Sequence, residues 1–111
     1  MHTKAHIIFD KTKSSLKILS DLKKIIIPVS LNNANLFIVI GGDGYMLKTL
    51  KKFYKHKKPF YGINSGSYGF LMNKFSKKNF LKNLKKTRSI SINPLIMFVK
   101  KKNKILFRKK N

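Results

Sequence analysis

The sequence predicts an open α/β fold whose sheet is mostly parallel. Short apolar runs rich in β-branched residues alternate along the chain with segments whose apolar residues recur at helical spacing. One run, residues 36–40, is apolar without interruption, which is typical of a strand buried on both faces of a parallel sheet. Glycine-rich segments directly follow two of the apolar runs, and ligands bind at such junctions in open α/β sheets.

The first third of the chain supplies the elements that lead to this buried strand. Ala5–Phe9 is apolar and β-branched, so it predicts the first strand. A helix is expected over residues 14–24, where leucines recur at helical spacing. Residues 25–29 are apolar but include Pro28, so any strand there is expected to be short or at a sheet edge.

The remaining chain continues this alternation and then changes character. Residues 45–56 carry apolar side chains on one helical face, and residues 60–63 predict another short strand. A short basic helix is expected over residues 79–86. The pattern then becomes β-like, so we expect residues 1–88 to form one Rossmann-like α/β domain and residues 89–111 to begin a β-rich second domain that is incomplete.

The composition excludes several classes of protein. The absence of cysteine excludes a disulfide scaffold, a cysteine-ligated zinc site and a cysteine nucleophile. The acidic residues are three scattered aspartates, which argues against the paired carboxylates of a glycosidase. No run approaches the roughly 18 apolar residues of a membrane span, and the N-terminus lacks the features of a signal peptide. We therefore expect a cytoplasmic protein with no membrane partner.

The chain is strongly basic, with 26 basic and 3 acidic residues and a formal charge of +23. All the basic residues except Arg88 and Arg108 are lysines, which lack the planar fork that suits base and phosphate recognition. Lysine, asparagine, isoleucine and phenylalanine are abundant together, as A/T-rich codon usage would make them. We attribute the charge to this bias and predict no specific nucleic-acid partner. A non-catalytic basic module that binds polyanions is the alternative.

The segment Gly41-Gly42-Asp43-Gly44 follows the predicted buried strand and precedes a helix. Glycines let a phosphate or ribose approach the backbone closely, and a helix N-terminus offers free N–H groups. A carboxylate at Asp43 could accept a proton from a hydroxyl nucleophile or help to hold a metal ion. Lys48, one turn into the helix, could reach a phosphate. The structural alternative is a tight turn in which Asp43 only caps the helix.

A second glycine-rich segment, with the sequence GINSGSYGFL from Gly62 to Leu71, also follows a predicted strand. Two such loops at the ends of successive strands would border one crevice. The alternative is that these glycines only make turns.

The two segments together, in this order, resemble the glycine-rich motifs of the NAD kinase family. The second family motif is similar to G-x-N-x-G-x-x-G-F-L and is matched by Gly62, Asn64, Gly66, Gly69, Phe70 and Leu71. The resemblance covers most of the chain and implies that residues 1–88 are the α/β N-terminal domain of such a kinase. It also implies phosphorylation of the adenosine ribose 2′-hydroxyl of NAD, with ATP or polyphosphate as donor, to give NADP.

The resemblance carries roles onto the first glycine-rich segment. Asp43 is the expected proton acceptor for the ribose 2′-hydroxyl, and Asp43 and Gly44 are expected to contact the NAD ribose. Lys48 is expected to lie near the nucleotide. Gly41 and Gly42 would let the phosphate donor approach.

The resemblance also implies what else the site contains. Asn64 and Gly66 would shape the loop beside the site without a direct catalytic role. A divalent cation, usually Mg²⁺, would accompany the donor, and no protein ligand is assigned to it. Members of the family carry a second β domain with an Asn-Glu motif, which this chain cannot complete because it has no glutamate.

We therefore expect a fragment of a longer enzyme rather than a truncated gene product. The isolated 111 residues are expected to be inactive, and the full-length protein is expected to form a homo-oligomer. A kinase of the same superfamily that acts on a lipid or a sugar is the alternative, because its members carry related glycine-rich motifs.

Overall fold

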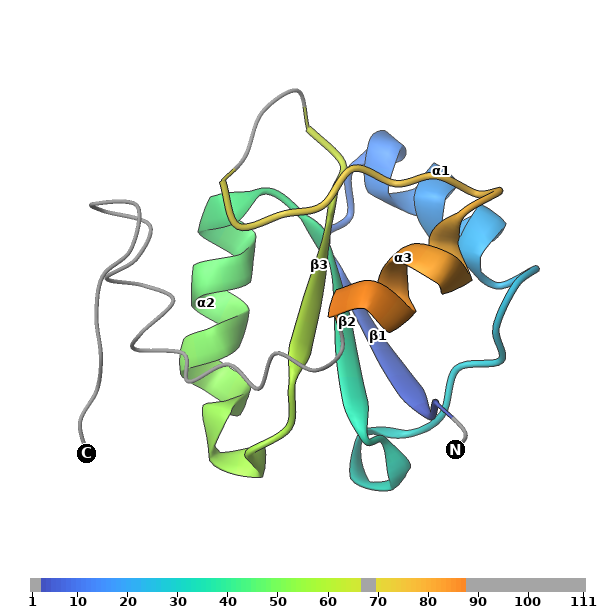
Figure 1. The fold of residues 1–111 in the computed structure, drawn as a ribbon. Coiled ribbons are helices and arrows are strands. Elements are labelled where there is room, and N and C mark those ends of the chain that lie inside the picture. The colour runs from blue at the N-terminus through green and yellow to red at the C-terminus, as the bar shows by residue number, and fades with distance from the viewer. Residues whose placement is uncertain (1–2, 67–69, 88–111) are drawn as a thin grey trace.

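The computed structural model describes residues 3–66 and 70–87, which form a three-stranded sheet with helices on both faces (Figure 1). None of the helices in these ranges is long and apolar enough to cross a membrane. The elements are β1 (Ala5–Phe9), α1 (Lys13–Leu22), the single-turn 3₁₀ helix η1 (Leu31–Asn33), β2 (Leu36–Gly41), α2 (Asp43–Phe53), the 3₁₀ turn η2 (Tyr54–His56), β3 (Phe60–Asn64) and α3 (Phe80–Thr87).

The sheet is parallel throughout, and its strands lie in the order β1-β2-β3. The central strand β2 pairs with both neighbours, so that Ile38 lies opposite Ile7 on one side and Tyr61 on the other. Every residue of β2 is buried, which explains its continuous apolar sequence. The parallel α/β fold predicted from the sequence is confirmed.

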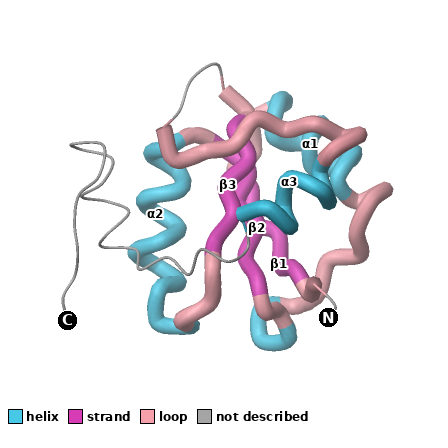
Figure 2. Tube along the Cα trace, in the orientation of Figure 1, coloured by secondary structure: helices cyan, strands magenta, loops and turns pink. Residues whose placement is uncertain are grey.

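Alternate residues of each strand enter two separate apolar layers. One face of the sheet packs against α1 and α3, with Leu22 and Phe80 among its fully buried side chains. The other face packs against α2, which contributes Met46 and Leu50. Figures 1 and 2 show α2 on one side of the strands and α1 and α3 on the other.

The two crossover connections differ in hand. Both advance in the same direction through the sheet, from β1 to β2 and from β2 to β3. However, α1 and α2 cover opposite faces. Crossovers that advance in one direction on opposite faces have opposite hands, so one of these two is the left-handed form that parallel sheets rarely contain.

Two predicted elements differ from the structure. Residues 25–29 form no strand, because Pro28 lacks an N–H group and Val29 makes a single backbone hydrogen bond to β1, from its N to Ala5 O at 2.8 Å. The helix predicted over residues 45–56 begins two residues earlier, at Asp43, and gives way to a 3₁₀ turn at Tyr54. The β-rich unit predicted over residues 89–111 lies outside the described residues.

Candidate functional site

The carboxyl ends of all three strands meet at one edge of the sheet. Asp10 follows β1, and its N–H group donates to Ile40 O at 3.1 Å. Ser65 follows β3, and its N–H group donates to Gly41 O at 3.0 Å. These contacts bring the two glycine-rich segments together beside β1, as expected for the ligand-binding edge of an open α/β sheet.

The carboxylate of Asp43 joins the two glycine-rich segments directly. Asp43 Oδ2 accepts the N–H group of Phe70 at 2.7 Å, and Oδ1 accepts that of Leu71 at 2.8 Å. The N-cap of α2 is Gly42, and no side chain caps this helix. The alternative in which Asp43 only caps its own helix is therefore wrong, because the carboxylate binds a loop that follows the next strand.

The glycines of the first segment have different surroundings. A Cβ atom on Gly41 would lie 2.9 Å from Tyr45 Cδ2 and 3.1 Å from Asp10 Oδ2, so packing alone requires glycine there. A Cβ atom on Gly42 or on Gly44 would meet nothing within 4 Å. Neither of these two has a positive φ, so neither packing nor backbone conformation requires glycine at them. The space beside Gly42 and Gly44 is open to a ligand.

The second loop begins with a side-chain-to-backbone turn. Asn64 Oδ1 accepts the N–H group of Gly66 at 3.0 Å, which fixes the chain where it leaves β3. Gly62 lies inside β3 rather than in a turn, and a Cβ atom on it would meet the sulfur of Met72 and the methyl group of Met46. Gly62 therefore serves core packing, whereas Asn64 and Gly66 shape the loop. Gly69 lies outside the described residues.

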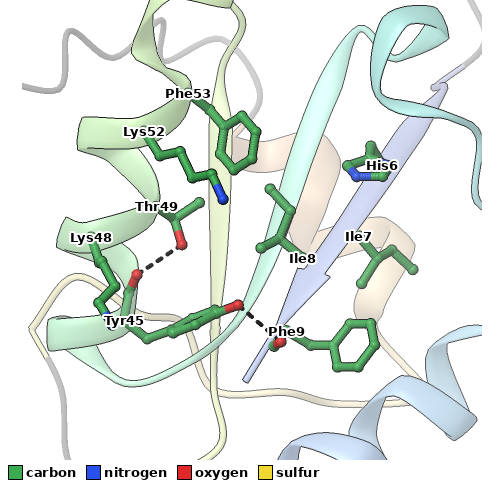
Figure 3. Close-up of a pocket in the computed structure, with 9 residues that line it drawn as sticks. All are labelled: His6, Ile7, Ile8, Phe9, Tyr45, Lys48, Thr49, Lys52 and Phe53. Atoms are coloured by element: carbon green, nitrogen blue, oxygen red, sulfur yellow. Dashed lines mark hydrogen bonds between the residues drawn. The ribbon is translucent and has the colours of Figure 1, made fainter. Parts of the chain in front are cut away.

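Tyr45 links the start of α2 to the end of β1. Its hydroxyl donates to Phe9 O at 2.9 Å, and Thr49 Oγ1 donates to Tyr45 O at 2.8 Å (Figure 3). Burial and, second, the negative charge of Asp10 raise the pKa of the Tyr45 hydroxyl above its ordinary value. Tyr45 therefore remains a neutral donor that holds the first glycine-rich segment against β1.

Asp10 is a second carboxylate at the same edge of the sheet. Burial raises its pKa, but hydrogen bonds from the Ser15 and Thr12 side chains and the Thr12 N–H group outweigh burial and lower the pKa overall. Thr12 Oγ1 and N donate to Asp10 Oδ1 at 2.8 and 3.2 Å. Asp10 is thus held as an anion beside Gly41.

Lys48 lies on α2, the helix that begins at Asp43. It lines a groove of about 380 Å³ between α2 and β1, together with Lys52 on the same helix (Figure 3). The floor of this groove includes Ile8 of β1 and Phe53 of α2. The structure thus places Lys48 with β1, and Asp43 with residues 70 and 71.

The sequence prediction did not include Asp10, Ser15 or Tyr45. Asp10 could have been found from the sequence, because it is an aspartate at the end of a predicted strand, as Asp43 is. Ser15 and Tyr45 could not be found in this way, because their partners Ser65 and Phe9 are distant in sequence.

The residues described in the structure, 3–66 and 70–87, contain no group of three or more histidine, aspartate or glutamate side chains that could hold a metal ion. The described residues therefore do not offer a complete ligand set for a divalent cation.

Comparison with known proteins agrees with the arrangement of the two glycine-rich segments. The family model of the ATP-NAD kinase N-terminal domain matches residues 2–89. The NAD kinase of Rickettsia canadensis (strain McKiel) is 39% identical over 97 residues, which cover 87% of this chain and 38% of that relative. The NAD kinase of Rickettsia felis (strain ATCC VR-1525 / URRWXCal2) is 37% identical over 94 residues, which cover 85% of this chain and 37% of that relative.

The chain therefore spans less than two fifths of the length of these relatives. The family match covers both glycine-rich segments and the whole sheet described above. The family predicted from the two motifs is confirmed, and the chain belongs to the ATP-NAD kinase N-terminal domain family.

Proposed function

We propose that this chain is the N-terminal part of an NAD kinase and that Asp43 accepts the proton of the attacking hydroxyl. The reaction is the transfer of a phosphoryl group from ATP or polyphosphate to the adenosine ribose 2′-hydroxyl of NAD. The observation that carries this proposal is the position of the Asp43 carboxylate, which lies between the two glycine-rich segments at the carboxyl edge of the sheet.

The hydrogen bonds of Asp43 suit the role of a positioned base. Each carboxylate oxygen can accept two hydrogen bonds, and the Phe70 and Leu71 N–H groups occupy one position on each. The carboxylate is held in orientation and keeps acceptor capacity for a hydroxyl. Asp43 is partly exposed, so its carboxylate is accessible to a substrate.

The open space beside Gly42 and Gly44 supports the approach of a ligand to this carboxylate. Gly44 lies in the first turn of α2, where glycine is less favourable than alanine, and no packing contact requires glycine at Gly42 or Gly44. Unpaired N–H groups at a helix N-terminus favour negatively charged groups. Gly42 and Gly44 would therefore admit the phosphate or ribose groups, whereas Gly41 serves the packing of Tyr45.

The proposed step forms one bond and breaks another. The 2′-oxygen of the ribose attacks the terminal phosphorus of the donor, while the bond between that phosphorus and the rest of the donor breaks. The hydroxyl proton passes to an oxygen of Asp43. The products are NADP and ADP or a shortened polyphosphate. Positioning and charge neutralisation dominate catalysis of this class of reaction, and the base contributes a further part.

A divalent cation, Mg²⁺ in the first instance, is proposed to arrive with the phosphoryl donor. The described residues do not form a ligand set for it, and Mg²⁺ typically keeps several waters and binds phosphate oxygens. Its chemistry would be to neutralise the charge of the donor phosphates. No step is assigned to a protein-held metal.

The test measures the phosphorylation of NAD by the Asp43→Asn variant of the full-length protein of which we propose this chain to be a part. We expect turnover of NAD to fall at least about 100-fold, the usual contribution of a positioned base. Asp21→Asn is the matched control, since Asp21 forms an ion pair with the exposed Lys77 at 3.8 Å. Full turnover in Asp43→Asn would overturn the role of Asp43. Preference for a lipid or sugar over NAD in substrate competition would overturn the assignment of the substrate.

A further inference from the structure

Ser15 occupies a position on α1 where an apolar residue is the ordinary choice. It shares the buried face of the helix with Leu19 and Leu22, and its relative exposure is 0%. A buried hydroxyl is destabilising unless it is hydrogen-bonded. The Ser15 and Ser65 hydroxyls form a hydrogen bond with 2.7 Å between their Oγ atoms, which connects the first turn of α1 to the start of the second glycine-rich loop.

Ser65 is held from two directions. Its hydroxyl is bound by Ser15, and its backbone N–H group donates to Gly41 O at 3.0 Å. The far end of the same loop is held by Asp43, through Phe70 and Leu71. The loop is therefore anchored at its start by Ser15 and at its end by Asp43.

Asp10 in turn orients Ser15. The Ser15 side chain and Thr12 both hydrogen-bond to the Asp10 carboxylate. Thr12 Oγ1 also accepts the N–H group of Ser15 at 3.2 Å as the N-cap of α1. The end of β1 and the first turn of α1 thus present the Ser15 hydroxyl to the loop in a fixed direction.

We propose that Ser15, oriented by Asp10, is a positioning residue that sets the start of the second glycine-rich loop relative to Asp43. Ser15 acts on the site through Ser65 and does not itself touch a substrate. The effect on catalysis rests on the proposed function, whereas the effect on the loop does not.

The first experiment measures amide hydrogen exchange by NMR in the 111-residue chain. In Ser15→Ala, the amides of Ser65 and Gly66 should exchange about three- to tenfold faster, the factor that one neutral hydrogen bond represents. The amide of Ile38 in the sheet centre should be unchanged. Ser20→Ala is the matched control, because Ser20 is an exposed serine on the same helix. Equal exchange at Ser65 in Ser15→Ala and Ser20→Ala would overturn the proposal.

A second variant keeps the test decisive if Ser15→Ala does not fold. Ser65→Ala leaves α1 and the Asp10 contacts in place and should speed exchange at Gly66 by the same factor. The double variant should then match either single variant, because both remove one interaction. Additive effects in the double variant would mean that the two hydroxyls act independently, which would overturn the proposal.

A third measurement separates this proposal from the function of the site. In the native protein, Ser15→Ala should lower kcat/KM for NAD while the optimum pH stays that of the parent, because the base is untouched. Ser20→Ala should change neither. Unchanged kcat/KM together with faster loop exchange would overturn the catalytic consequence only. Full activity of Asp43→Asn would instead overturn the proposed function and leave the anchoring of the loop intact.

Discussion

At the residue scale, the Asp43 carboxylate divides its two oxygens between the N–H groups of Phe70 and Leu71. An asparagine at this position has the same shape but only one acceptor oxygen. The substitution would therefore remove the proposed base and also place an amide N–H group against a backbone donor. Activity lost in Asp43→Asn thus contains a catalytic part and a loop part, and amide exchange at Phe70 and Leu71 in the same variant measures the loop part.

A pair of alanine substitutions distinguishes glycines that serve packing from those that serve a ligand. Gly44→Ala should leave the free energy of unfolding unchanged or raise it by up to about 1 kcal/mol, because alanine is the better helix former. It should nevertheless reduce turnover of NAD in the native protein, since the methyl group enters the open space. Gly41→Ala should lower the free energy of unfolding by about 1–3 kcal/mol through contact with Tyr45. Chemical denaturation beside an NADP assay would measure both, and equal stability losses in the two variants would contradict this division.

Asp10 gives the chain an acid-sensitive contact. Its folded-state pKa lies below the ordinary value of 3.8, so its contribution to stability is present above pH 3.8 and is lost as the pH falls through the folded-state pKa. Asp10→Asn should therefore flatten the acid limb of a plot of stability against pH. Thermal unfolding at a series of acidic pH values would measure this, with Asp21→Asn as control. An acid limb identical in Asp10→Asn and the parent chain would contradict it.

At the scale of elements, α1 divides its apolar side chains between core and solvent. Leu22 is fully buried between α1 and the sheet, whereas Leu16 on the same helix is 44% exposed. Leu22→Ala should lower the free energy of unfolding by about 2–5 kcal/mol, through lost burial and the cavity left behind. Leu16→Ala should cost less than about 1 kcal/mol. Similar losses in urea denaturation of the two variants would contradict the placement of α1.

The sequence was sufficient for the elements whose pattern is local. The continuous apolar run of β2 and the helical periodicities of α1, α2 and α3 predicted these elements within two or three residues at each end. Residues 25–29 were ambiguous because an apolar run with a proline has the composition of a strand without the hydrogen-bonding capacity of one.

The site was only partly predictable. Asp43 and its glycines follow a strand, so the rule for strand ends located them. The partners of Asp43 lie 27 and 28 residues further along the chain, and Ser65 lies 50 residues from Ser15. Local pattern contains no information on such distant pairs. The alternative of Asp43 as a simple helix cap could therefore be resolved only in three dimensions.

At the scale of the whole molecule, the chain combines a compact sheet with a formal charge of +23. Its relatives named NAD kinase are more than twice as long as the segment matched here. We expect the 111 residues alone to form no NADP from NAD with either ATP or polyphosphate, because they match less than two fifths of the length of the NAD kinases they resemble. An enzymatic cycling assay for NADP would detect low turnover. NADP formation above that of the Asp43→Asn chain would contradict this expectation.

The order β1-β2-β3 along the sheet has a consequence in time. Each strand pairs with the one made before it, so the sheet can grow at one edge while the ribosome is still translating. Asp43 emerges well before its partners Phe70 and Leu71, which follow 27 and 28 residues later. At about 5–20 residues per second, this interval lasts about one to five seconds. During synthesis of the chain, Asp43 is therefore made before the loop that orients its carboxylate.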